Sequence, residues 1–135
     1  MGLCKRMKKN NKNTMCPERA NIFIIEDSSE YLSSVKNFLE LNDHTVVDSA
    51  STVDEAFTKI PLFQEENIDV VLLDGNLSKN RTNCEDGEII AKAIHDAYPN
   101  LAVIGHATEH PLVNANVNSL KTEGPVKLSE IIKNI

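Results

Sequence analysis

The sequence predicts an α/β fold, a doubly wound five-stranded parallel sheet between two helical layers. Short runs rich in apolar residues, such as 21–25 and 68–73, are typical of strands buried on both faces of a parallel sheet. Segments with apolar residues at helical spacing lie between them, so strand and helix signals alternate from residue 21 onward. With 135 residues, the chain is expected to form one domain with its own core.

The individual elements follow from the same patterns. The expected strands are residues 21–25, 44–49, 68–73 and 101–104, with a fifth near 117–121. Helices are expected after Ser28, after an N-cap at Ser51, over 87–98 up to Pro99, and after Pro125. Their core-facing residues are expected to be Leu32, Val35, Phe38 and Leu39; Ala56, Phe57 and Ile60; Ile90, Ala93, Ile94 and Ala97; and Leu128, Ile131, Ile132 and Ile135. Three asparagines, Asn114, Asn116 and Asn118, predict a short or irregular helix before the fifth strand.

Composition separates a basic tail from an acidic body. Residues 1–20 have a net charge of +5, within a total of -6, and are expected to form a disordered tail before a folded domain at 21–135. Aromatic residues make up 4% of the chain and Trp is absent, which disfavours a base-stacking surface for nucleic acid. The three cysteines contain no CxxC pair, and no apolar run approaches ~18 residues. We therefore expect a reduced, cytoplasmic protein without a membrane span.

Carboxylates stand directly after two of the predicted strands. Glu26 and Asp27 follow the first strand, and Asp74 follows the third. In open α/β sheets, ligands bind beyond the carboxyl ends of the strands, so these acids are expected to converge on a divalent cation. In the alternative interpretation the acids only cap the following helices, as Asp27 would do before Ser28.

The order of these motifs resembles the receiver domain of two-component response regulators. The resemblance covers residues 21–135 and includes the acidic pair, the later Asp, Gly87 at the start of the third helix and Pro125 at the start of the last. It implies the flavodoxin-like receiver fold and a phosphoryl acceptor at Asp74. Glu26, Asp27 and Asp74 would bind Mg²⁺, together with the backbone carbonyl of Asn76. A hard cation held by oxygen ligands neutralises charge on both the nucleophile and the phosphoryl group.

Two positions depart from the pattern of the family. His106 stands where receivers usually have Ser or Thr, and Gly124 stands where a Lys precedes the Pro. Lys121 is a candidate for the displaced cation, and Thr108 is an alternative hydroxyl that would modulate access of water. His106 has two interpretations, either a buried neutral side chain that closes the pocket or a protonated donor to phosphate.

The loop expected over 75–86 is longer than is usual in the family. It contains Lys79 and Arg81, either of which could fold over a phosphoryl group, although a solvated surface loop is the favoured interpretation. Cys84 in the same loop is an oxidisable thiol at most.

The resemblance implies a stand-alone receiver that takes a phosphoryl group from a histidine kinase or phosphotransfer protein and signals through a separate protein partner. The reaction would be self-modification rather than enzymatic turnover. The alternative is an adaptor of receiver fold that phosphorylation does not switch, which the changes at His106 and Gly124 favour. A phosphatase of the haloacid dehalogenase type would need Asp at Asn76, and a flavodoxin would not place Glu26 and Asp27 beside a phosphate.

Overall fold

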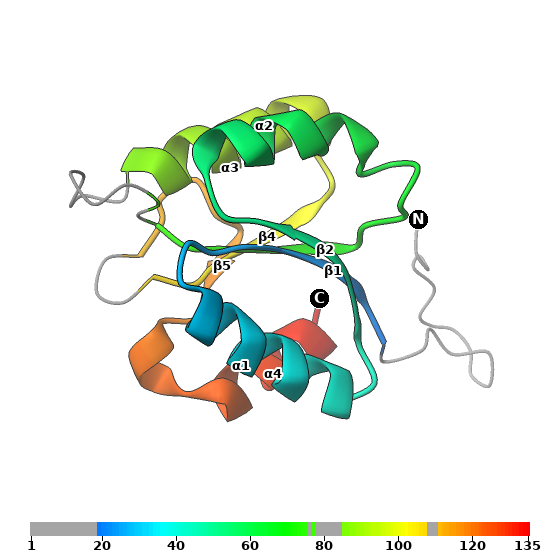
Figure 1. The fold of residues 1–135 in the computed structure, drawn as a ribbon, viewed down its shortest axis with the longest axis vertical. Helices are drawn as coiled ribbons and strands as arrows, with labels where there is room; N and C mark the ends of the chain where they lie inside the picture. The colour runs from blue at the N-terminus through cyan, green and yellow to red at the C-terminus, as the bar shows by residue number, and fades with distance from the viewer. Residues whose placement is uncertain (1–18, 76, 78–84, 108–110) are drawn as a thin grey trace.

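A parallel β-sheet forms the middle layer of the molecule (Figure 1). The structure is a computed structural model that describes residues 19–75, 77, 85–107 and 111–135. The strands are β1 (Asn21–Ile25), β2 (Thr45–Ala50), β3 (Val70–Leu73), β4 (Ala102–Gly105) and β5 (Val117–Asn118). Their order in the sheet is β2-β1-β3-β4-β5, and every neighbouring pair is parallel. The predicted doubly wound fold is confirmed.

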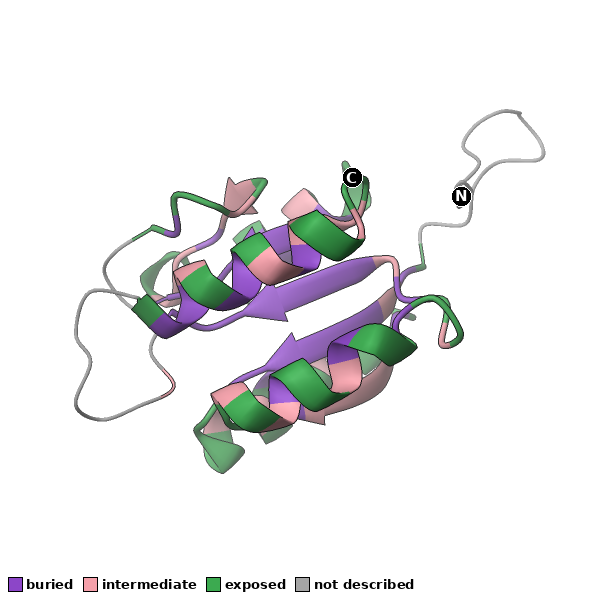
Figure 2. Ribbon diagram, turned by 90° about the horizontal axis from the view of Figure 1, so that it is seen from above, coloured by how far each residue is buried: buried purple, intermediate pink, exposed green. Residues whose placement is uncertain are grey.

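Helices cover both faces of this sheet. In Figure 1, α1 (Ser29–Leu41) and α4 (Pro125–Lys133) lie on one face, and α2 (Val53–Lys59) and α3 (Glu85–Ala97) lie on the other. Two short 3-10 turns, η1 (Ile60–Leu62) and η2 (Lys121–Glu123), complete the described elements. Figure 2 shows that the central strands are buried, whereas the helices expose one side. This difference explains the continuous apolar runs of the strands and the periodic pattern of the helices.

Alternate residues of β1 belong to the two cores. Ile22 and Ile24 pack with residues of α1 and α4, while Phe23 and Ile25 pack with residues of α2 and α3. Successive side chains of a strand point to opposite faces, so a strand covered on both sides has to be apolar at every position. β3 is buried throughout for the same reason.

Several predicted boundaries were wrong by a few residues. β2 runs one residue later than expected, β3 begins at Val70, and β4 is shifted by one residue to 102–105. The N-cap of α2 is Thr52, whose hydroxyl accepts the Glu55 N–H at 3.1 Å. Of the expected core residues, Ala97 is exposed and Phe57 and Ile135 are each 41% exposed, and Phe63 fills the aromatic position beside Phe23 instead. Propensity alone does not decide between adjacent capping residues.

The β2 edge of the sheet is irregular. The register between β1 and β2 shifts after Ile22, so that Ile22 pairs with Val46 but Phe23 pairs with Asp48. Lys59 reaches this strand from α2, donating to the Ser49 carbonyl at 2.7 Å and pairing with Asp48 at 3.2 Å. The strand is therefore held from the side by a helix residue.

Asparagine side chains organise the connection between β4 and β5. In residues 106–107 and 111–116, which the structure describes, no helix forms. Asn118 Oδ1 accepts the Leu112 N–H at 2.8 Å, and its amide donates to the Leu112 carbonyl at 3.1 Å. Asn116 Oδ1 accepts the Val103 N–H at 2.7 Å. The two asparagine side chains thus bond backbone groups of the connection and of β4.

The third helix begins earlier than predicted. α3 starts at Glu85, so the loop expected through Asp86 ends before it, and Gly87 lies within the first turn. A Cβ at Gly87 would lie 2.8 Å from Gly75 Cα and 2.9 Å from the Asp74 carbonyl oxygen. Glycine at this position allows the helix to approach the end of β3 closely.

Candidate functional site

The ends of three neighbouring strands place the candidate residues at one edge of the sheet. Backbone N–H groups of residues just beyond each strand donate to the adjacent strand: Glu26 to Ala50 at 2.9 Å, Asp74 to Ile25 at 2.9 Å, and His106 to Leu73 at 2.8 Å. These bonds extend the sheet by one residue at each point. The side chains that follow β1, β3 and β4 are therefore held by the sheet itself.

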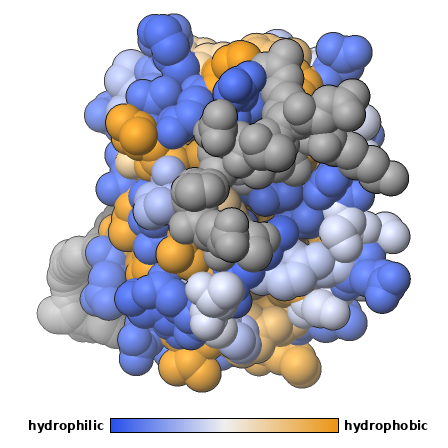
Figure 3. Space-filling view, turned by 90° about the vertical axis from the view of Figure 1, so that its left-hand side faces the viewer, coloured by the Kyte–Doolittle hydropathy of each residue, from blue (hydrophilic) through white to orange (hydrophobic). Residues whose placement is uncertain are grey.

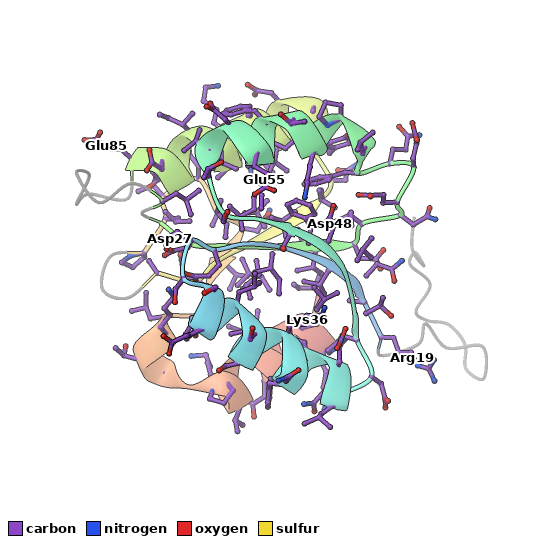
Figure 4. All side chains as sticks on the ribbon, in the orientation of Figure 1. Arg19, Asp27, Lys36, Asp48, Glu55 and Glu85 are labelled. Carbon is purple, nitrogen blue, oxygen red and sulfur yellow. The ribbon has the colours of Figure 1, made fainter. Side chains whose placement is uncertain are left out.

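Glu26, Asp27 and Asp74 come together at this edge. Each offers a carboxylate oxygen, and the three oxygens lie within 4.8 Å of one another. Glu26 and Asp74 are buried, whereas Asp27 is exposed. Figure 4 shows Asp27 at the same edge as Glu85 and opposite Arg19, and Figure 3 shows hydrophilic side chains spread across that edge between separate hydrophobic patches.

The oxygen atoms of this acidic cluster fit a hard cation. Mg²⁺ takes oxygen ligands at about 2.1 Å in an octahedron, so its ligands lie within roughly 4.2 Å of one another. A small contraction of the three carboxylates would reach that spacing. The alternative interpretation of Asp27 as a helix cap is wrong, because the N-cap of α1 is Ser28, whose hydroxyl accepts the Tyr31 N–H at 3.2 Å.

Burial and mutual repulsion change the acidity of the cluster. Burial, followed by the nearby Glu26 carboxylate, raises the pKa of Asp74 to about 7. Burial also raises the pKa of Glu26, against the opposing effect of the Lys121 ammonium group. A bound cation would reverse these effects by favouring the ionised carboxylates.

Lys121 supplies a cation to the acidic cluster. Its ammonium nitrogen lies 2.8 Å from Glu26 Oε1 and 3.6 Å from Asp74 Oδ1, and its side chain is 17% exposed. β5 was expected to continue to Lys121 but ends at Asn118, and Lys121 begins η2 instead. Its backbone N–H donates to the Ala107 carbonyl at 2.9 Å, which fixes the residue beside the end of β4.

His106 is buried beside this cluster and is bonded at both ring nitrogens. Nδ1 donates to the Ser119 carbonyl, and Nε2 lies 2.5 Å from the Tyr31 hydroxyl. Burial lowers the pKa of His106, and the nearby Lys121 charge acts in the same direction. The geometry thus favours the neutral side chain that closes the pocket over the protonated donor to phosphate. Tyr31, which no sequence motif marks as a site residue, lines the same small pocket as Glu26 and Asp74.

Other sequence-predicted positions lie outside the described residues. They are Asn76, Thr108, Lys79, Arg81, Cys84 and the tail up to residue 18. The proposed carbonyl ligand and the alternative hydroxyl therefore stay predictions. In the described parts of the chain, no helix combines the length and apolarity that crossing a bilayer requires.

Substituting Gly124 by lysine is expected to destabilise the protein. Gly124 has φ +89° and ψ 167°, a backbone conformation that is essentially restricted to glycine. We expect Gly124→Lys to lower the free energy of unfolding by about 1–2 kcal/mol, measured by urea denaturation. A Gly124→Ala variant should lose a similar amount, because the strain arises from the Cβ rather than from the charge. Unchanged stability of both variants would contradict this interpretation.

Replacing Asp74 by asparagine is expected to stabilise the metal-free protein above neutral pH. The native state binds the Asp74 proton more tightly than the unfolded state. The free energy of unfolding of wild type therefore decreases as the pH rises from the unfolded pKa near 3.8 to the folded pKa of about 7. Asp74→Asn removes this decrease and should raise the free energy of unfolding by about 1–2 kcal/mol at pH 8, less than the whole pKa shift would give, because solvent and neighbouring charges screen the site. Denaturation at pH 4 provides the control, where the difference attributable to Asp74 ionisation should shrink toward zero.

Comparisons with known proteins agree with this geometry. Crystal structures of a CheY-like response regulator receiver domain protein from Methanospirillum hungatei JF-1 and of a response regulator receiver domain protein from Clostridium thermocellum are 25% and 29% identical to the chain, with TM-scores of 0.69 and 0.68. The matches cover 85% of this chain and 91% and 92% of those chains, respectively. The anti-anti-sigma factor PhyR from Bartonella quintana shares the fold at 20% identity and a TM-score of 0.66, over 85% of this chain and 46% of PhyR.

At the level of sequence, no curated protein matches the chain. The sequence model of the response regulator receiver domain matches residues 22–123, which include the acidic cluster, His106 and Lys121. This match and the order of the strands confirm the resemblance noted from the motifs. The chain therefore belongs to the response regulator receiver domain family.

Proposed function

We propose that the protein accepts a phosphoryl group on Asp74 and signals through contact with another protein. The observation that carries this proposal is the convergence of the Asp74 carboxylate with two further carboxylates and the Lys121 ammonium group. Nucleophile, cation-binding oxygens and a counter-charge are the groups that phosphoryl transfer to a carboxylate requires.

In the proposed reaction, an Asp74 oxygen attacks the phosphorus atom of the donor. The new O–P bond forms as the P–N bond to a donor histidine breaks, and the imidazole leaves with its electron pair. Mg²⁺ held by Glu26, Asp27 and Asp74 would neutralise charge on the nucleophile and the phosphoryl oxygens. Lys121 is close enough to Asp74 to pair with a phosphoryl oxygen after the transfer. The reaction modifies the protein itself, and weak autodephosphorylation is the only turnover that we propose.

A histidine kinase or a phosphotransfer protein is the proposed donor, and the output is a separate protein partner. The family assignment supports a donor of this class. The similarity of fold to a protein described as an anti-anti-sigma factor supports an output by protein contact. We place this exchange in the cytoplasm.

The experiment is to incubate the protein with acetyl phosphate and Mg²⁺ and to measure its intact mass. We expect an adduct of one phosphoryl group that requires Mg²⁺ and is absent from Asp74→Asn. Beryllofluoride, observed by fluorine NMR, provides a second measurement because it mimics an acyl phosphate without a covalent transfer. No Asp74-dependent adduct with either reagent would refute the phosphoacceptor function.

The second candidate function is an adaptor of receiver fold whose partner binding does not depend on phosphate. It is favoured by His106, which provides no hydroxyl at the family position and is already bonded at both ring nitrogens. Binding of a partner with equal affinity by wild type and Asp74→Asn, in the presence and absence of acetyl phosphate, would support the adaptor.

A further inference from the structure

Residues from three separate elements form a continuous chain of contacts beside the acidic cluster. Tyr31 extends from α1, His106 follows β4, and the segment from Ser119 to Lys121 follows β5. The Tyr31 hydroxyl contacts His106 Nε2, and His106 Nδ1 contacts the Ser119 carbonyl. The Lys121 ammonium nitrogen lies 4.3 Å from the centre of the Tyr31 ring. Tyr31 and His106 thus both contact the segment that carries Lys121, Tyr31 through Lys121 itself and His106 through Ser119.

The direction of each hydrogen bond in this chain is fixed by chemistry. A carbonyl oxygen only accepts, so His106 Nδ1 carries the proton, and Nε2 of the neutral ring is an acceptor. The Tyr31 hydroxyl must then donate to Nε2. Burial raises the pKa of Tyr31 to about 12, with the Glu26 and Asp74 charges acting in the same direction, so the hydroxyl keeps its proton. Tyr31 is consequently held by His106 at its hydroxyl group and contacts Lys121 with the face of its ring.

Lys121 needs such support because its own side chain is flexible. Its backbone is fixed by the bond to Ala107, but a lysine side chain loses much rotamer entropy when it is held in place. The ammonium group also lies against two carboxylates that offer several oxygen atoms. An aromatic face at cation–π distance restricts which of these positions it occupies.

We propose that Tyr31 is a positioning residue that directs the Lys121 ammonium group toward Glu26 and Asp74, and that His106 acts through Tyr31 by orienting its ring. The two departures from the family pattern are then parts of one arrangement. His106 accepts a hydrogen bond from the Tyr31 hydroxyl on α1, and the ring that carries this hydroxyl supplies the surface against which the displaced lysine lies. The placement of the Lys121 ammonium group by Tyr31 is inferred from these contacts alone. Any effect of this placement on phosphoryl transfer rests on the proposed function.

The first test observes Lys121 in the metal-free protein by NMR of its ¹⁵N-labelled ammonium group. Wild type should show a slowly exchanging ammonium signal and ring-current shifts of the adjacent methylene protons. Tyr31→Leu should abolish both, and Tyr31→Phe, which keeps the ring but removes the hydroxyl, should retain reduced shifts. Lys127 is the matched control because it forms an exposed ion pair with Glu123 at 3.3 Å, and among the described residues only Lys121 has a cation–π contact. Unaltered Lys121 signals in Tyr31→Leu would overturn the proposal.

The second test is a double-mutant cycle on Mg²⁺ affinity, measured by calorimetry. Lys121→Met removes a competing cation and should tighten Mg²⁺ binding. If Tyr31 acts through Lys121, Tyr31→Leu should change the affinity about threefold in wild type but not in the Lys121→Met background. Similarly, His106→Gln should change the Mg²⁺ affinity when Tyr31 is present and leave it unchanged in the Tyr31→Phe background.

An equal effect of Tyr31→Leu in both backgrounds would show a merely structural role and refute the proposal. Circular dichroism of each variant checks that it folds. If Tyr31→Leu does not fold, the milder Tyr31→Phe substitution replaces it in both tests. The NMR measurement needs neither Mg²⁺ nor phosphate. Failure of phosphorylation would therefore contradict the proposed function while leaving this inference standing.

Discussion

Replacing Lys121 by methionine is expected to slow phosphorylation of Asp74 by acetyl phosphate about a hundredfold. The Lys121 ammonium nitrogen lies 3.6 Å from Asp74 Oδ1, beside the position that the transferred phosphoryl group would take. Loss of one preorganised charge at a developing anion typically costs this much. The rate is measured by intact mass at saturating Mg²⁺, so that a change in metal affinity does not contribute.

Mg²⁺ affinity provides a second measurement, which should change in the opposite direction to the rate of phosphorylation. The same substitution should tighten Mg²⁺ binding, because Lys121 competes with the ion for Glu26 and Asp74. Lys127→Met, which removes an exposed lysine from α4, should alter neither quantity. A Lys121→Met variant phosphorylated at the wild-type rate would show that the counter-charge comes from elsewhere.

The Gly87→Ala substitution is expected to lower the free energy of unfolding by about 3 kcal/mol and to impair phosphorylation as well. The new Cβ would lie 2.8 Å from Gly75 Cα and 2.9 Å from the Asp74 carbonyl oxygen. Both contacts are with backbone, which cannot rotate away, so α3 must move relative to the end of β3. The clash outweighs the ~1 kcal/mol that alanine gains over glycine within a helix.

Urea denaturation of wild type and Gly87→Ala measures this loss. The control is Lys92→Ala on the exposed side of α3, where the side chain is 70% exposed and its pair with Asp96 spans 3.4 Å. Surface substitutions of that kind change stability by less than about 0.5 kcal/mol. A Gly87→Ala variant as stable as Lys92→Ala would mean that α3 does not need its close approach to Asp74.

The acidic residues of the site were predictable because their positions follow from strand ends. Glu26, Asp27 and Asp74 stand directly after apolar runs, and parallel strands bring their carboxyl ends to one edge. Lys121 was a candidate only because a cation was lacking at Gly124. Its placement depends on β5 ending after two residues and on η2 turning the chain, neither of which has a strong local signal.

Tyr31 could not be recognised as part of the site from its sequence position. It lies in the first turn of α1, three residues after the N-cap Ser28, where an aromatic residue is usually read as part of the core. Its role depends on His106, which is 75 residues away in the sequence. The available signal was His106 itself, since most buried polar side-chain atoms have a hydrogen-bond partner.

The irregular β2 edge has a consequence for the behaviour of the protein at high concentration. A parallel sheet of five strands leaves two edges whose free backbone groups could pair with another molecule. β5 offers only two residues, and the six-residue β2 is interrupted by its register shift and by the Lys59 ammonium group on the Ser49 carbonyl. Both edges are therefore poor templates for strand addition, and Lys59 protects the longer edge against aggregation as well as anchoring α2.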